Sequence, residues 1–183
     1  MAVPDYQSLM LPLLRFAGER KDETSTGEAV EVLAKEFGLT DDDLKEMLPS
    51  GIQSAFVNRV GWASTYMKKA GLLEATRRGY YRLTSRGQDL LKKQPKAINV
   101  KLLKQYPEFL EFQQLKGTRS GEKVSSSVGA PDISTATPSE ALETAYENLR
   151  DELVDELLAR LKKASPSFFE RVVVELLVKM GYG

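Results

Sequence analysis

Residues 53–87 read QSAFVNRVGWASTYMKKAGLLEATRRGYYRLTSRG. The first part of this stretch has helical spacing, because its apolar residues recur at steps of three and four and so share one face of a helix. These residues are Phe56, Val60, Ala63, Met67 and Ala70. Gly71 follows where a helix ends, a position at which glycine adopts the left-handed conformation without steric cost. The sequence therefore predicts a helix over residues 53–70.

Two short runs of strand-forming residues come next, LLEA at 72–75 and YYRL at 80–83. The residues between them, 76–79, form a short basic loop that contains a glycine, which is the usual signal for a β-hairpin. Ser85 and Gln88 have the spacing of a capping box and predict the start of another helix. A helix, a hairpin with a basic tip and a second helix, in that order, indicate a winged helix-turn-helix domain whose wing is the hairpin.

The polar face of the 53–70 helix and the wing carry side chains that suit a DNA duplex. Such a helix lies in the major groove and reaches base edges and phosphates, and we expect the wing to meet the backbone or the minor groove. The expected contact residues are Asn58, Arg59, Ser64, Thr65, Lys68 and Lys69 on the helix, and Arg77, Arg78, Tyr80 and Arg82 on the wing. We expect Tyr80 and Tyr81 to pack on one side of the hairpin. Trp62 has two open roles, a core position or a contact with a base or methyl group.

The composition limits the chemistry. The chain has 183 residues, of which 42% are apolar and 28% are charged, which suits one or two globular units. Its apolar runs are shorter than the roughly 18 residues of a membrane span, and the N-terminal residues lack a secretory pattern, so we expect a cytoplasmic protein. The chain has no cysteine and no histidine. Disulfides, the common zinc sites and histidine-dependent catalysis are therefore excluded.

The formal net charge of zero hides a separation of charge along the chain. Residues 53–96 have a net charge of +8, residues 1–52 have −6 and residues 97–183 have −2. Positive charge gathered on one element is typical of a protein that binds a polyanion. The alternative is that these bases only solvate a surface. Combined with the helix and hairpin, the charge favours double-stranded DNA as the partner.

Helices also flank this stretch. Before it, the apolar spacing and capping residues predict helices over residues 4–16, 25–37 and 40–48, with a polar loop at 18–23. The three aspartates at 41–43 are placed in a first helical turn, where the helix dipole favours carboxylates over a metal site. After it, the sequence predicts a helix over 85–93 and an aromatic-rich tail that packs back on the domain. We place the winged-helix domain at residues 1–115.

The last third of the chain changes character. Residues 116–137 are rich in serine, glycine and threonine and predict a flexible linker. Thr137, Pro138 and Glu140 open a long amphipathic helix, and Ser165 and Pro166 open another whose apolar residues cover most of its circumference. We expect residues 138–183 to be a helical segment that starts a further domain, and residues 138–180 to support a homodimer. The fold class is mainly α: a winged helix-turn-helix domain, a linker and two C-terminal helices.

Four stretches resemble Mrr-type restriction proteins: MAVPDYQSLMLPLLRF at 1–16, NRVGWASTYMKKAGLLE at 58–74, RGYYRLTSRG at 78–87 and SPSFFERVVVELLVKMGYG at 165–183. The resemblance implies a winged-helix domain joined by a linker to a nuclease domain that cleaves modified, typically methylated, DNA. In that family the last stretch is the first helix of the nuclease domain, and the catalytic Asp and Glu-x-Lys that bind magnesium lie beyond it. This chain has no Asp followed by a strand-borne Glu-x-Lys. It therefore receives no catalytic residue, and magnesium is expected only for a nuclease domain.

Two further functions stay open. A winged helix also serves as a protein-interaction or dimerisation module, for which an acidic partner suits the basic stretch equally well. Winged helices also occur in transcriptional regulators. Salt dependence and competition by duplex DNA separate the DNA-binding functions from the protein-binding one.

Overall fold

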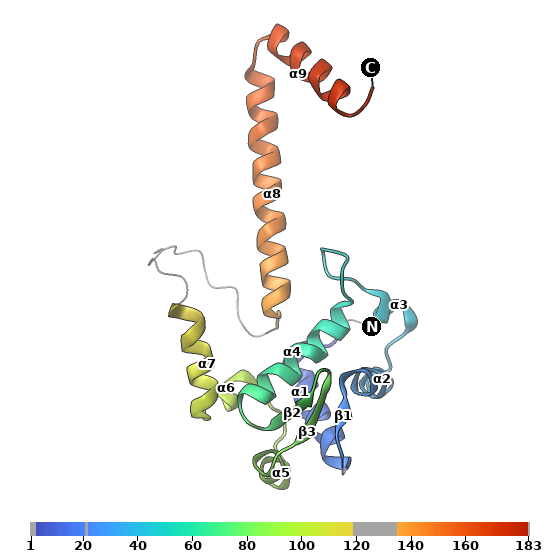
Figure 1. The fold of residues 1–183 in the computed structure, drawn as a ribbon, viewed down its shortest axis with the longest axis vertical. Coiled ribbons are helices and arrows are strands. Elements are labelled where there is room, and N and C mark those ends of the chain that lie inside the picture. Colours follow the sequence, from blue (N-terminus) through green and yellow to red (C-terminus); the bar gives the residue numbers. More distant parts are fainter. Residues whose placement is uncertain (1–2, 21, 119–134, 183) are drawn as a thin grey trace. The chain divides into compact units, whose positions relative to one another are not determined.

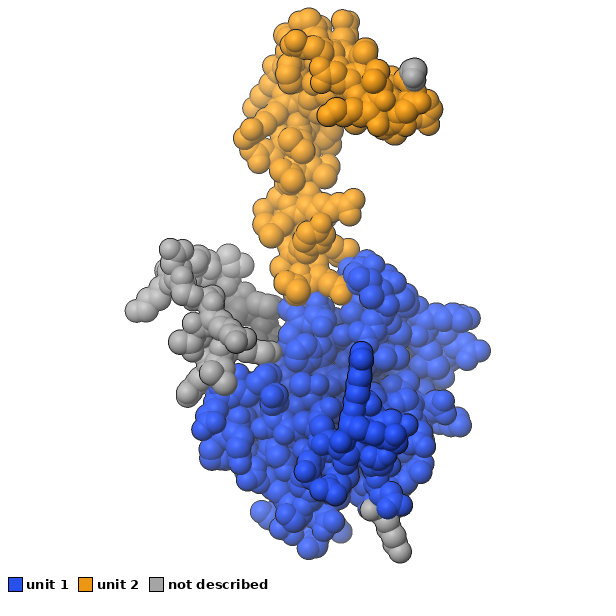
Figure 2. Space-filling model, viewed as in Figure 1, with its two compact units in different colours: residues 1–141 blue, residues 142–183 orange. Residues whose placement is uncertain are grey.

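A computed structural model describes residues 3–20, 22–118 and 135–182, and the chain divides into two compact units, Met1–Ala141 and Leu142–Gly183 (Figure 2). The structure is mainly helical with one small antiparallel sheet, which confirms the predicted fold class (Figure 1). The helices are α1 (Tyr6–Glu19), α2 (Thr26–Glu36), α3 (Asp41–Lys45), α4 (Ala55–Lys69), α5 (Ser85–Lys92), α6 (Val100–Leu103), α7 (Pro107–Thr118), α8 (Pro138–Lys163) and α9 (Pro166–Lys179), and the strands are β1 (Thr24–Ser25), β2 (Leu73–Arg77) and β3 (Tyr80–Leu83).

The core of the first unit forms where α1 packs against α4. The predicted apolar face of α4 is confirmed, because all five of its residues are buried. Asp5 caps α1 by accepting hydrogen bonds from the backbone N–H groups of Gln7 and Ser8. The capping box of α2 is also confirmed, since Ser25 and Glu28 exchange hydrogen bonds as the sequence predicts. Local capping and helical periodicity therefore determine these two helices.

The sheet has three strands in the order β1–β3–β2, and the hairpin β2–β3 is the wing. Strand β1 pairs with β3 through Thr24 opposite Tyr81 and Ser25 opposite Tyr80. Strand β1 has no signature in the sequence, because two residues are too few to show a periodicity, and the strand is held by its distant partner β3. A bulge between Ala75 and Arg77 ends the regular pairing of β2 with β3 next to the turn.

Two local predictions in this region are wrong. Tyr80 and Tyr81 do not lie on one side of the hairpin, since neighbouring residues of a strand point to opposite faces. Tyr81 is fully buried in the core, and Tyr80 faces the other way and is partly exposed. The cap of α5 is Thr84 rather than Ser85: the Thr84 hydroxyl accepts a hydrogen bond from the Gly87 N–H at 3.1 Å.

The segment predicted as a linker, residues 116–137, is partly structured at its ends. Helix α7 continues to Thr118, residues 119–134 lie outside the described residues, and Thr137 is fully buried in the first unit. Thr137 and Glu140 exchange hydrogen bonds as a capping box at the predicted start of α8. The domain boundary at 138 therefore falls within a turn that packs on the first unit.

The second unit consists of most of α8 and of α9, which Ser165 caps as predicted. Neither helix contains a buried residue within this unit. Most apolar residues of α9 are exposed and Val172 is half-buried, although the sequence predicted a buried helix. Within the described part of the chain, no helix is both long and apolar enough to cross a membrane.

Candidate nucleic-acid interface

Helix α4 is the helix that the sequence predicts to contact DNA, and the wing follows directly after it (Figure 1). Its core side is filled, so only its outward side and its flanks remain for a ligand. These surfaces differ along the length of the helix. The C-terminal half lies beside the wing, whereas the N-terminal half is covered by another part of the first unit.

The C-terminal half of α4 and strand β2 border an open groove with a volume of about 570 Å³. We call it the α4–β2 groove. Thr65, Lys68 and Lys69 line one side and Glu74 and Ala75 line the other. The Thr65 hydroxyl donates to the Gly61 carbonyl at 2.9 Å, which leaves the oxygen able to accept. The structure therefore brings three of the predicted contact residues together.

The two lysines of the groove are held by aromatic rings. The Lys68 ammonium lies 5.8 Å from the centroid of the Tyr81 ring, and the Lys69 ammonium lies 5.3 Å from that of Phe112. Burial lowers the pKa of Lys68, because the low-dielectric surroundings disfavour the charged form. Lys69 is exposed. Both positions are suited to attract phosphate groups.

The arginines of the wing differ in the partners that they contact. Arg77 stacks on Tyr80, with its guanidinium carbon 3.7 Å from the ring centroid, and pairs with Glu23. Arg82 pairs with Glu74 at 2.9 Å. Hydrogen bonds from Thr76 and Arg77 lower the pKa of the Glu23 carboxyl. These pairs are exposed, and exposed pairs contribute only about 0–1 kcal/mol, so a phosphate can replace either carboxylate at little cost.

Arg78 differs from its neighbours on the wing. It is exposed, and no residue that the structure describes forms an ion pair or hydrogen bond with it. The adjacent Gly79 has φ of +79°, a left-handed conformation that glycine adopts without steric cost. Arg78 therefore sits at the tip of the wing and is available to a ligand.

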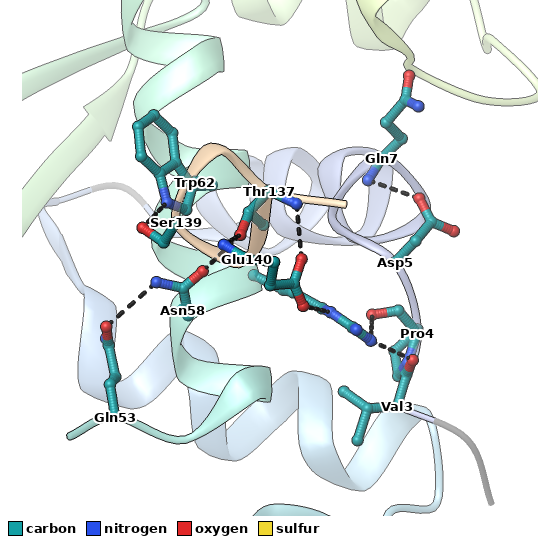
Figure 3. A network of polar contacts seen from close by, with 11 residues as sticks. Val3, Pro4, Asp5, Gln7, Gln53, Asn58, Trp62, Thr137, Ser139 and Glu140 are labelled. Atoms are coloured by element: carbon teal, nitrogen blue, oxygen red, sulfur yellow. Dashed lines mark hydrogen bonds and ion pairs between the residues drawn. The ribbon is translucent and has the colours of Figure 1, made fainter. Parts of the chain in front are cut away.

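The N-terminal half of α4 is covered by residues 137–140, which we call the 137–140 turn (Figure 3). The Thr137 hydroxyl donates to Asn58 Oδ1 at 2.8 Å, and Asn58 Nδ2 donates to Gln53 Oε1 at 3.2 Å. Trp62 Nε1 donates to the Ser139 hydroxyl at 3.0 Å. This turn lies within the first unit.

Arg59 joins the same network from the flank of α4. Its Nε donates to Glu140 Oε1 at 2.8 Å, and its Nη1 donates to the carbonyls of Val3 and Pro4 at 2.6 and 3.3 Å. Arg59 and Glu140 are only 21% and 14% exposed. The ion pair is therefore shielded from water, unlike those of the wing.

The structure places part of the predicted interface away from an open surface. Asn58 and Ser64 are 6% and 1% exposed and do not lie on an open face. Asn58 is buried beneath Thr137, and Ser64 lies close to the core side, where its hydroxyl has no hydrogen-bond partner among the described residues. Of the two roles open for Trp62, the structure favours the core position: the side chain packs partly buried against the core, and its indole N–H binds the 137–140 turn.

Sequence reasoning missed Thr137, Ser139 and Glu140 as neighbours of α4. Their spacing identified a helix start correctly, but a capping box carries no information on what the helix start packs against. The described residues contain no group of three or more Asp, Glu, His or Cys side chains that is arranged to hold a metal ion. The magnesium expectation concerned a nuclease domain and stays untested.

Comparison with known proteins gives two matches. The chain is 30% identical over 190 aligned residues to an Escherichia coli (strain K12) protein described as type IV methyl-directed restriction enzyme EcoKMrr. The alignment covers 100% of this chain and 61% of that protein, so the chain spans about three fifths of the length of its relative. No solved structure matches the chain. Residues 6–93 match the family described as the Mrr N-terminal domain.

Proposed function

We propose that the first unit binds duplex DNA through the α4–β2 groove and the wing, as the DNA-recognising part of an Mrr-like restriction enzyme. The observation that carries this proposal is the position of Lys68 and Lys69 beside a wing with an exposed Arg78 at its tip, within an Mrr N-terminal domain. In this arrangement the groove and wing follow the phosphate backbone, and Thr65 is the side chain placed to reach a base edge.

The charge distribution supports an anionic partner. Most of the excess positive charge of the chain lies in residues 53–96. Some of it has internal roles, since Arg86 donates to the Ala70 carbonyl at 3.0 Å and to Glu108 at 2.9 Å. The lysines of the groove and the arginines of the wing remain at the surface, where phosphates exchange with carboxylate partners at little cost.

The substrate that we propose for the whole enzyme is taken from the description of the relative. The relative is described as a methyl-directed restriction enzyme, and we propose modified, typically methylated, DNA as the substrate here as well. Hydrolysis and its magnesium ion belong, in this proposal, to the two fifths of the relative's length that the chain does not span. The chain would then contribute recognition without a catalytic residue.

A salt series of duplex binding tests this proposal. The full chain is titrated with a short labelled duplex, methylated or unmethylated, and compared with the Arg77→Ala/Arg78→Ala double variant. We expect the slope of log K against log salt to flatten by about 0.9 for each lost phosphate contact. The control is Lys35→Ala/Lys45→Ala, which removes two exposed positive charges from α2 and α3. Equal slopes for both variants, or no binding at low salt, contradict the proposal and favour a protein partner.

We also propose a homodimer through residues 138–180, as an assembly of the second unit. The exposed apolar residues of α8 and α9 favour it: Leu149 is 66% exposed, Leu153 54% and Phe169 50%. Such surfaces are usually covered in an assembly. Sedimentation of the full chain tests it, with a dimer expected for the natural sequence and a monomer for Leu149→Glu/Leu153→Glu. A monomeric natural chain contradicts it.

A further inference from the structure

The 137–140 turn occupies the outward side of α4 in its N-terminal half, the part of a recognition helix that reaches base edges in helix-turn-helix complexes. We infer that this turn competes with duplex DNA for α4, so that full engagement of α4 requires the turn to leave. This inference rests on the proposed function and adds a regulation of the same site.

The hydrogen bonds of Asn58 carry the first step. An asparagine reads adenine by using its amide oxygen as acceptor and its amide nitrogen as donor at the same time. Here Asn58 Oδ1 accepts from Thr137 and Nδ2 donates to Gln53. Both groups are occupied, and Asn58 is 6% exposed. A base cannot use this side chain until Thr137 has moved.

Arg59 and Trp62 carry the second step. The Arg59 guanidinium uses Nε for Glu140 and Nη1 for two backbone carbonyls, so two of its three nitrogens are engaged within the first unit. Glu140, whose side chain is 14% exposed, also neutralises the Arg59 charge that a polyanion would otherwise attract. The indole N–H of Trp62 is taken by Ser139. The turn thus engages three neighbouring side chains and neutralises the charge of one of them.

The contact also links two elements. The 137–140 turn begins α8, which continues past Ala141 into the second unit. If DNA and the turn exclude each other, duplex binding weakens the anchoring of α8, and a firmly anchored α8 weakens duplex binding by the same factor. Binding of duplex DNA and anchoring of α8 on the first unit are then coupled through the 137–140 turn, and no further contact is needed.

The test compares duplex affinity of the full chain with that of the Thr137→Val/Glu140→Gln variant at one salt concentration. When a binding-competent state is only partly populated, the apparent dissociation constant is raised by the inverse of its population. We expect the variant to bind about tenfold more tightly. The matched control is Glu147→Gln, which removes the same charge from α8 within the second unit and is expected to change affinity less than twofold.

Trp62 is the only tryptophan of the chain, so its fluorescence reports the turn directly. In the absence of DNA, we expect acrylamide to quench the variant more strongly than the natural chain, because the indole loses its cover. Ser139→Ala removes only the hydrogen bond to Trp62 and keeps the capping box. It should give an intermediate affinity, and it provides a second test if the double variant is poorly folded.

The outcomes separate the two proposals. If neither the natural chain nor the variants bind duplex at low salt, the proposed DNA-binding function fails. A second outcome is that the Trp62 fluorescence shows an uncovered indole in the variants, yet the variants bind duplex as tightly as the natural chain or more weakly. In that case DNA binding stands and the proposed competition is overturned. The competition is also overturned if Trp62 stays covered in both variants, because the turn then remains bound to α4 and does not leave it.

Discussion

Arg59 Nε lies 2.8 Å from Glu140 Oε1, although the two residues are 81 positions apart in the chain. The same guanidinium binds the backbone carbonyls of Val3 and Pro4. Arg59 therefore holds together the N-terminal segment, α4 and the start of α8. In this arrangement, a residue that the sequence predicts as a DNA contact is engaged within the first unit.

Loss of this side chain should destabilise the first unit. Arg59→Ala removes hydrogen bonds to a charged group and leaves Glu140 shielded without its partner, which we expect to lower the free energy of unfolding by about 2–3 kcal/mol. Arg59→Lys keeps the charge but not the fork, so a smaller loss is expected. Urea unfolding followed by circular dichroism measures both. Arg160→Ala breaks an exposed pair with Glu156 and should change the value by less than about 0.5 kcal/mol.

Gly87 is required by a close approach of α5 to the chain before β2. A Cβ atom at this position would lie 2.4 Å from the Leu72 carbonyl oxygen and 2.6 Å from a methyl carbon of Leu83. Since backbone cannot move aside as a side chain does, Gly87→Ala should lower the free energy of unfolding by about 1–3 kcal/mol. A stable Gly87→Ala variant with unchanged urea midpoint would contradict this packing.

Gly61 is the matched control for that prediction. It lies in the middle of α4, and a Cβ atom there meets nothing within 4 Å. Because alanine has a higher helix propensity than glycine, Gly61→Ala should raise the free energy of unfolding by about 0.5–1 kcal/mol. The two substitutions are chemically identical, and only their surroundings give them opposite signs.

The cap of α3 should make the chain sensitive to acid. Hydrogen bonds from the Thr40 hydroxyl and the Thr40 backbone N–H lower the pKa of Asp43 to about 2. A lowered folded-state pKa contributes stability above the ordinary value of about 3.9, and that contribution is lost as pH falls from 3.9 towards 2. Urea midpoints measured from pH 5 to pH 2 should therefore fall less steeply for Asp43→Asn than for the natural chain. Asp42→Asn, which changes the same turn without its cap, should keep the natural slope.

Phe109 anchors α7 on α4. Its side chain is fully buried, and its ring packs edge-on against Tyr66 with the centroids 5.5 Å apart. Phe109→Ala leaves a cavity, so we expect a loss of about 3–5 kcal/mol in the free energy of unfolding. Phe112→Ala removes a partly buried ring from the same helix and should cost less. Equal losses of unfolding free energy for the two variants in urea would contradict the expectation that the burial of the ring sets the size of the loss.

The elements that local interactions control could be predicted. The five apolar residues of α4 repeat at helical steps and are all buried, and the caps formed by Ser25, Thr137 and Ser165 lie where the sequence places them. The predictions failed where an element was too short to show a pattern, or where its position depended on residues distant in the chain. Strand β1 has two residues and exists only because β3 lies beside it. The cap of α5 shifted by one residue because Thr84 also binds the carbonyls of Gly71 and Leu72.

The sequence by itself determined a mainly helical chain with a basic winged-helix domain, because periodicity, caps and charge act within a few residues of each other. Only the tertiary structure decided which polar residues of α4 are open. Asn58 and Arg59 look like Thr65 and Lys69 in the sequence, since all four lie off the apolar face. They differ because residues 137–140 pack on the N-terminal half of the helix and leave the C-terminal half beside the wing. A contact between residues about 80 positions apart leaves no periodic trace in either segment, so no local pattern could assign it.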